Sequence, residues 1–193
     1  SLYTGRQGAP SAALSGVLPR LPPMVRRRVL ASGVATVEKE EARRLQSYLR
    51  ATVRLTGALY RGGVKVLAGS DGMAGFTLLR ELELLQQAGL RPAEVLKVAT
   101  LDAAEWMGRG RELGSIEVGK RGDLLLVEGD PLADISQLRR AALVFYEGAL
   151  LHPAALYHEL SIQPVEVGQP AILGDAPSLG RVAPIPGVGA GGR

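Results

Sequence analysis

Asp71 is the residue of this sequence whose type and setting most clearly indicate chemistry. It follows the apolar run of residues 64–68 and lies in the small-residue stretch GSDG. The small residues leave space beside the carboxylate, which can bind a metal ion or take a proton from a bound water. Aspartate is also common at the start of a loop, because its side chain tolerates turn conformations. The stretch alone leaves both interpretations open.

Other side chains that bind metals or attack substrates are scarce. The sequence has no cysteine, which excludes a disulfide framework, a thiol nucleophile and a cysteine-bound zinc site. His152 and His158 do not have the i, i+4 spacing with which a helix presents a metal-binding pair. We expect surface or local structural roles for both histidines. Asp123 begins an apolar run, and we expect it to make turn hydrogen bonds.

Four large apolar residues near these positions have alternative roles. Met73 and Phe76 follow Asp71 and can line the apolar side of a substrate pocket. They can equally pack against the loop at residues 5–20, and the sequence does not decide between the two. Trp106 and Met107 fit a helical pattern and are expected in the core.

The elements that must hold Asp71 form an α/β pattern. Residues 64–68 are apolar, Val-rich and bounded by glycines, which predicts a buried strand of a parallel sheet. Such a strand needs neighbouring strands, and the chain supplies none nearby, so we expect that partners are missing. Helices are predicted at about residues 24–30, from a cap at Thr36 to the pair Gly62–Gly63, and over residues 77–88, 92–99 and 101–107.

From about residue 112 the pattern changes to short strands. LGSIE and DLLLVEG predict two strands, and ALVFYEGALL predicts further strand structure with Gly148 in a hairpin turn. DPLADISQLRR indicates a turn and a short helix, and PAALYHEL a last helical turn. Residues 164–193 are rich in Pro and Gly without an apolar period, and are expected to form a mobile tail. The chain therefore reads as an α/β part followed by a separate β unit.

Composition limits the partners. The 193 residues are 46% hydrophobic and only 4% aromatic, which predicts a core of Leu, Val and Ala. The net charge of +4 comes from scattered arginines without a binding motif, so no nucleic-acid partner is expected. No long apolar stretch or signal peptide is visible, which favours a cytoplasmic protein without a membrane partner. The chain begins without Met, so we expect a piece or a processed product of a longer protein.

Three segments together resemble the amidohydrolase superfamily: GVKVLAGSDG, GFTLLRELELLQQAGLRPAEVLKVATLDAAEWMG and LGSIEVGKRGDLLLVEGDPLADI. Their order and spacing are similar to the C-terminal part of its imidazolonepropionase-like and Xaa-Pro-dipeptidase-like members, over roughly residues 1–150. The resemblance implies an α/β fold, the C-terminal fragment of a metal-dependent (β/α)8 barrel plus strands of a small β-sandwich domain. Residues 1–110 would belong to the barrel, 111–160 to the returning sandwich strands, and 161–193 to a Pro/Gly-rich tail.

The resemblance also implies a reaction, the metal-dependent hydrolysis of C–N bonds in a small amide or cyclic amide. GSDG resembles the Gly-Thr-Asp that ends the eighth barrel strand, although Ser70 replaces the usual Thr. Asp71 would then contact a divalent metal, with zinc the expected ion, and take a proton from the attacking water. The family's metal-binding histidines would precede residue 1, so this chain alone is expected to be inactive. Its partner would be the rest of the parent chain or a complementing chain.

Two further interpretations stay open. The chain can be a non-catalytic subunit or interaction module that complements another chain, because the unpartnered strand and the lone carboxylate permit this. A homo-oligomer is also compatible with the sequence. The reading frame that precedes residue 1 would separate an enzyme fragment from a module.

Overall fold

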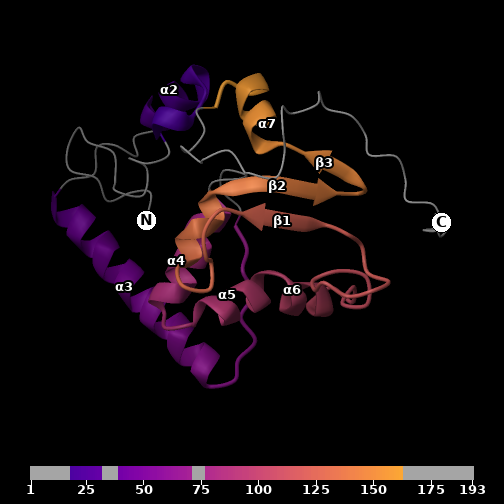
Figure 1. Ribbon diagram of the computed structural model, residues 1–193. Helices are drawn as coiled ribbons and strands as arrows, with labels where there is room; N and C mark the ends of the chain where they lie inside the picture. Colours follow the sequence, from indigo (N-terminus) through magenta and orange to yellow (C-terminus); the bar gives the residue numbers. More distant parts are fainter. Residues whose placement is uncertain (1–17, 32–38, 71–76, 163–193) are drawn as a thin grey trace.

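The computed structural model describes residues 18–31, 39–70 and 77–162. The helices are η1 (Leu18–Arg20), α2 (Pro23–Ala31), α3 (Lys39–Arg61), α4 (Thr77–Gln87), α5 (Pro92–Ala99), α6 (Leu101–Trp106), η2 (Ile135–Arg139) and α7 (Pro153–Glu159). The strands are β1 (Leu124–Val127), β2 (Ala141–Tyr146) and β3 (Ala149–Leu151). Figure 1 shows α5 and α6 below the sheet, next to β1, and α2 and α7 above it. The predicted helices are thus confirmed within a few residues.

Glycines end three of these helices in the same way. Gly63, Gly89 and Gly108 have φ values of 83°, 101° and 73°, in the left-handed region that a side chain disfavours. The residue after each glycine donates its N–H to a carbonyl five residues back, so these bonds join Val64 to Leu59, Leu90 to Leu85 and Arg109 to Ala104. This is the Schellman motif, which satisfies carbonyls that a helix end leaves unpaired. The predicted stop at Gly62–Gly63 is confirmed.

The core lies between α4, α5 and η2. Its buried residues are Leu82, Leu85, Ala88, Leu90, Val95, Val98 and Ile135. Helix α3 reaches this core through Val53 and Tyr60, and it approaches closely at Gly57. A Cβ atom at Gly57 would lie only 2.0 Å from the carbonyl oxygen of Ala88, so only glycine allows this approach.

The sheet is antiparallel, in the order β1-β2-β3. Strands β2 and β3 are joined by the two residues Glu147 and Gly148, because Tyr146 pairs with Ala149. Both turn residues have positive φ values, 49° and 77°, as the tight hairpin turn that matches strand twist requires. The predicted hairpin at Gly148 is confirmed. A second sheet, which a sandwich would need, is not seen in the described ranges.

Two predicted strands and two predicted core positions are wrong. Residues 64–70 and 112–117 contain no strand, since neither segment has a strand beside it in the described part of the chain. A strand forms only where a neighbour accepts its hydrogen bonds. Trp106 and Met107 are 69% and 59% exposed rather than buried, because α6 turns only Ala104 fully into the core.

The domain bounds inferred from the resemblance stay a prediction. Among the described helices, none is long and apolar enough to cross a membrane.

Candidate functional site

The three predicted site residues, Asp71, Met73 and Phe76, lie outside the described residues. The structure describes what comes before and after them, residues 64–70 on one side and α4 on the other. These two anchors contact one another, because the Ser70 Oγ donates a hydrogen bond to the Thr77 Oγ1 at 2.6 Å. The ends of the stretch that carries Asp71 are therefore held together.

The approach segment, Val64–Ser70, is fixed on one side only. Val66 and Ala68 pack against the core cluster, as alternate residues of an extended chain can. The backbone of Lys65–Gly69 makes no hydrogen bond within the described part of the chain. Figure 1 shows this segment rising from the end of α3 without a strand beside it. The side chains of the segment thus pack on the core as those of a strand do, but its backbone is not hydrogen-bonded to a neighbouring strand in the described part of the chain.

A pocket of about 360 Å³ lies beside this segment. Its lining consists of Tyr60, Gly63, Val64, Lys65, Val66, Leu67, Lys97, Asp102 and Glu105. Lys97 donates a hydrogen bond to Asp102, and this bond is the main reason why the pKa of Lys97 is raised above its ordinary value. The negative charge of Glu105 acts in the same direction. The pocket therefore combines an apolar wall with a charged end.

The described residues do not fit a metal centre. Within the described ranges, no group of three or more His, Cys, Asp or Glu side chains could hold a metal ion. His152 occupies the N-cap position of α7 without a side-chain capping bond, and His158 lies exposed in the last turn of this helix. Both histidines thus have the local or surface positions that the sequence predicted. A metal in this protein would need ligands from outside the described residues.

A second polar cluster joins the helical layer to the β unit. Glu83 on α4 accepts hydrogen bonds from Arg139 Nε at 2.7 Å and from Arg80 Nη1 at 3.0 Å. Burial raises the pKa of Glu83, but the two arginines outweigh burial and hold the pKa below its ordinary value. Sequence reasoning missed this cluster, because only the i, i+3 spacing of Arg80 and Glu83 was visible.

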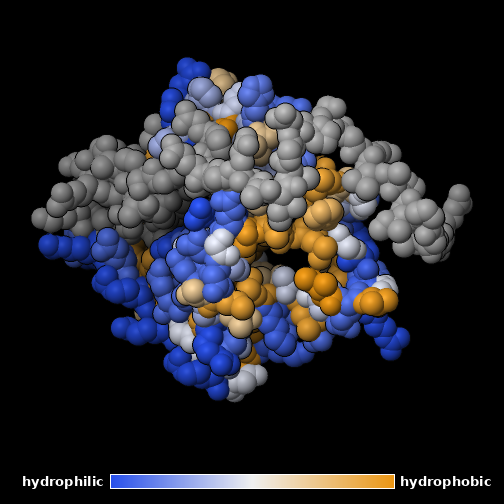
Figure 2. Space-filling model, viewed as in Figure 1, coloured by the Kyte–Doolittle hydropathy of each residue, from blue (hydrophilic) through white to orange (hydrophobic). Residues whose placement is uncertain are grey.

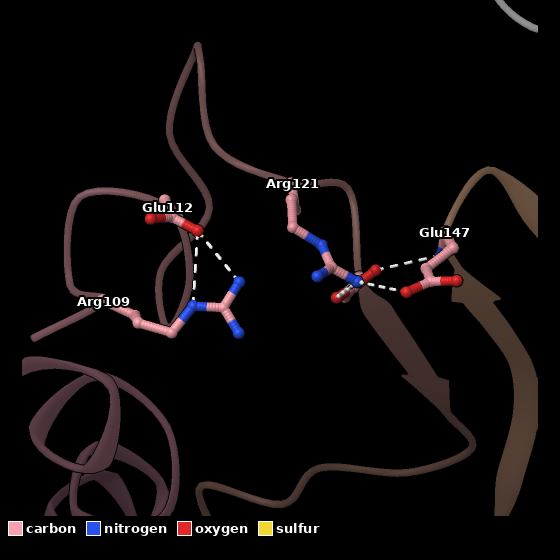
Figure 3. A network of polar contacts seen from close by, with 5 residues as sticks. Arg109, Glu112, Arg121 and Glu147 are labelled. Atoms are coloured by element: carbon pink, nitrogen blue, oxygen red, sulfur yellow. Dashed lines mark hydrogen bonds and ion pairs between the residues drawn. The ribbon is translucent and has the colours of Figure 1, made fainter. Parts of the chain in front are cut away.

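Asp123 has the structural role that the sequence predicted. Its carboxylate accepts the backbone N–H of Glu147 at 3.0 Å and pairs with Arg121 at 2.9 Å. Arg121 also reaches Glu147 at 3.2 Å, as Figure 3 shows beside the pair Arg109–Glu112. These contacts fix the β2–β3 turn against the start of β1.

A model of the amidohydrolase family matches residues 13–150. The imidazolonepropionase of Geobacillus sp. (strain WCH70) is 45% identical over 60 residues, which are 31% of this chain and 14% of that protein. Among solved structures, a protein classed as a prolidase from Bifidobacterium longum is 31% identical, with a TM-score of 0.50. The match covers 70% of this chain and 32% of that one.

A solved amidohydrolase gives a TM-score of 0.52 at 28% identity, and its match covers 65% of this chain and 32% of that protein. The aligned parts thus span about a third of these structures and a smaller share of the imidazolonepropionase. The family match includes the GSDG stretch, the helices α4, α5 and α6, and the strands β1 and β2. On this coverage, the chain belongs to the amidohydrolase family.

Proposed function

We propose that this chain carries part of the active site of a metal-dependent hydrolase that cleaves C–N bonds in small amides or cyclic amides. The observation that carries the proposal is the family match over residues 13–150, which includes Asp71 and the elements on both sides of it. The similarities to an imidazolonepropionase and to a protein classed as a prolidase support this class of reaction.

Asp71 is the proposed catalytic residue. Its carboxylate would take a proton from the water that attacks the substrate, and would also contact the metal. Met73 and Phe76 would line the apolar side of the substrate pocket. Two contacts hold the described residues on either side of this stretch: the hydrogen bond between Ser70 and Thr77, and the packing of Ala68 on the core.

The metal, zinc in this proposal, would be held largely by residues that the described part does not supply. The described ranges contain no suitable cluster of ligands, and the sequence has only two histidines, both near α7. We therefore propose that a further stretch of polypeptide completes the site, either in the parent chain or in a complementing chain.

Calorimetric titration of the 193-residue chain with zinc alone tests this division of the site. We expect no tight stoichiometric binding, because a single carboxylate is a weak ligand set. Tight binding of one ion per chain would contradict the proposal, since the chain would then build the metal centre itself.

The role of Asp71 is tested in the complete, active enzyme. Asp71→Asn keeps the size of the side chain and removes the base, so turnover should fall by about 100-fold to 10,000-fold. The matched control is Asp130→Asn, which changes a carboxylate that only accepts the N–H of Leu132 in a turn. Turnover of Asp71→Asn within about twofold of the control would remove Asp71 from the mechanism.

A second candidate function is that of a non-catalytic subunit that complements another chain. The backbone of Lys65–Gly69 favours it, because this backbone makes no hydrogen bond to any residue that the structure describes. Intact mass and subunit composition of the protein from its own cells separate the two. A single longer chain supports the hydrolase. A stoichiometric complex with another chain, whose activity does not change with Asp71→Asn, supports the non-catalytic subunit.

A further inference from the structure

The outer side of α3 carries a row of arginines that the linear sequence hides. Between Arg43 and Arg61 the helix has no acidic residue. At about 100° per residue, four of its arginines fall within about 40° of one another around the helix axis. This arginine row consists of Arg43, Arg50, Arg54 and Arg61, which are all exposed. It runs straight along the helix for about 27 Å, since each residue adds about 1.5 Å.

Little of the positive charge of the arginine row is balanced. Glu40 lies 3.9 Å from Arg43 and 3.8 Å from the next arginine, so its charge is shared between the two. Three members make no ion pair within the described ranges: Arg50, Arg54 and Arg61. At the start of α5, which follows the turn that Arg61 contacts, Arg91 pairs with Glu94 at 3.0 Å and adds no net charge. The row therefore fits a partner with negative charges.

The arginine row points away from the two apolar sides of α3. The side chains that pack on the core lie roughly 90° from the row around the helix axis. Leu55 and Leu59, which are 58% and 42% exposed, lie roughly 140° from it in the other direction. Polypeptide that buries these leucines or extends the core therefore approaches α3 from sides other than the row. The row is left at the surface for a separate chain.

The surroundings of the arginine row favour an acidic α-helix as the partner. A guanidinium group binds a carboxylate through two parallel hydrogen bonds. Beside the row, Ser47, Ala51 and Ala58 are small and exposed, so a second helix can lie close along α3. The row contains no large apolar side chain, which binding to a membrane surface would need, and no aromatic ring on which nucleic-acid bases stack. Among the described helices, none has more than two acidic residues, so a second copy of the chain does not supply such a helix.

We propose that the arginine row of α3 binds an acidic α-helix of a separate protein, whose carboxylates are spaced seven, four and seven residues apart. This is the spacing of the arginines themselves, and it is the same when read in either direction, so the partner helix can run either way along α3. Figure 2 shows strongly hydrophilic residues along α3, on the lower left of the molecule. The inference uses neither Asp71 nor a metal and thus goes beyond the proposed hydrolase.

A synthetic helix tests the match in spacing. The probe is a capped, fluorescently labelled peptide of alanine and glutamine with four glutamates in that spacing. The control peptide has the same composition and the same helicity by circular dichroism, but its glutamates are spread around the helix. Fluorescence anisotropy with the 193-residue chain at low ionic strength should give a dissociation constant at least about fivefold lower for the probe, because only the probe brings all four pairs together. Equal constants for the two peptides, or no binding of the probe, overturn the proposal.

Variants of the chain test which arginines bind the probe. Arg54→Gln keeps a good helix former and should weaken probe binding about threefold, and Arg50→Gln together with Arg54→Gln should weaken it about tenfold. The matched control is Arg44→Gln, which removes the same charge from the same helix about 100° away from the row and should change binding by less than about 1.5-fold. Equal weakening by Arg54→Gln and Arg44→Gln would assign the binding to diffuse charge and contradict the proposal.

Two further outcomes would overturn the proposal. Tighter binding of a short DNA duplex or of anionic lipid vesicles than of the probe, weakened by Arg54→Gln, would assign the arginine row to phosphate groups. Association of the chain with itself that Arg54→Gln abolishes would assign the row to a second copy. None of these measurements depends on hydrolysis. An Asp71→Asn variant of the complete enzyme that keeps full activity would remove the proposed catalytic role and leave the binding of the probe unchanged.

Discussion

The helical layer and the three-stranded sheet differ in how completely each buries its apolar residues. In the layer, Leu85, Leu90 and Val95 are between 0% and 3% exposed. In the sheet, Leu124, Leu125 and Leu126 are between 37% and 50% exposed, although every residue of β1 is apolar. The layer is therefore stabilised by its own packing, whereas much of the apolar surface of β1 is left for something else to cover.

The same difference appears in the backbone. The ends of α3, α4 and α6 are closed by bonds within the chain, and the hairpin turn is fixed by Asp123. The free edge of β1 and residues Lys65–Gly69 of the approach segment have no such bonds within the described residues. Local structure is complete where its partners are near in sequence, and incomplete where a sheet needs partners from further away.

A pair of leucine truncations can break this comparison, and they have the largest expected effect. Leu85→Ala empties a buried position in the layer and should lower the free energy of unfolding by about 3 kcal/mol. Leu125→Ala, on the half-exposed strand, should cost about 1 kcal/mol or less. Denaturant unfolding followed by circular dichroism measures both. Equal losses of unfolding free energy for the two variants would show that the sheet and the helical layer depend on apolar packing to the same extent.

The contact between the two regions is tested through Glu83. Glu83→Gln should lower the free energy of unfolding at neutral pH by about 2 kcal/mol, because it leaves Arg139 and Arg80 without a charged partner. The pKa of Glu83 is lower in the folded chain than its ordinary value of 4.5, so its contribution is present above that pH.

The contribution of Glu83 should then be lost as the pH falls through the lowered pKa. Denaturant unfolding of the unchanged protein and of Glu83→Gln at a series of pH values measures this loss. The difference in free energy of unfolding between the two proteins should become smaller in acid. The control Glu112→Gln removes an exposed pair and should change stability by about 0.5 kcal/mol at most. If the difference in free energy of unfolding between the unchanged protein and Glu83→Gln does not change with pH, the charge of Glu83 does not stabilise the contact between the two regions.

The hairpin gives the smallest expected effect. Asp123→Asn weakens the bond to the Glu147 N–H and the pair with Arg121, and should cost about 1 kcal/mol. Glu147→Gln changes a side chain that is 61% exposed and should cost less than half of that. Thermal unfolding of the two variants ranks them. The reverse order would assign the turn's stability to Glu147 instead of Asp123.

The sequence predicted those parts of the fold whose causes are local. Apolar spacing placed α4 and α5, glycines placed the helix ends, and Gly148 placed the hairpin. The strand predictions for residues 64–68 and for LGSIE were wrong. A strand depends on hydrogen bonds to a neighbouring strand, and the sequence of the segment itself does not show whether that neighbour is present. The prediction that Trp106 lies in the core was wrong, because a helical pattern does not show which face of the helix a neighbouring element covers.

The candidate site was predicted in outline only. The three segments together indicated the family, and the family match confirms that relationship. The positions of Asp71, Met73 and Phe76 stay predictions, as they lie outside the described residues. The arginine cluster around Glu83 was not foreseen, because Arg139 lies far from Glu83 in sequence and only folding brings them together.

The backbone of Lys65–Gly69, which makes no hydrogen bond within the described residues, also has a consequence for proteolysis. A protease binds its substrate as an extended chain, so helices and paired strands must open before they can be cut. Lys65 is exposed and lies four residues after the end of α3, and its backbone makes no hydrogen bond within the described residues, so trypsin can reach it without unfolding the layer. Lys97, within α5, requires that unfolding. Cleavage after Lys65 should therefore be faster than cleavage after Lys97 when the folded chain is digested briefly with trypsin.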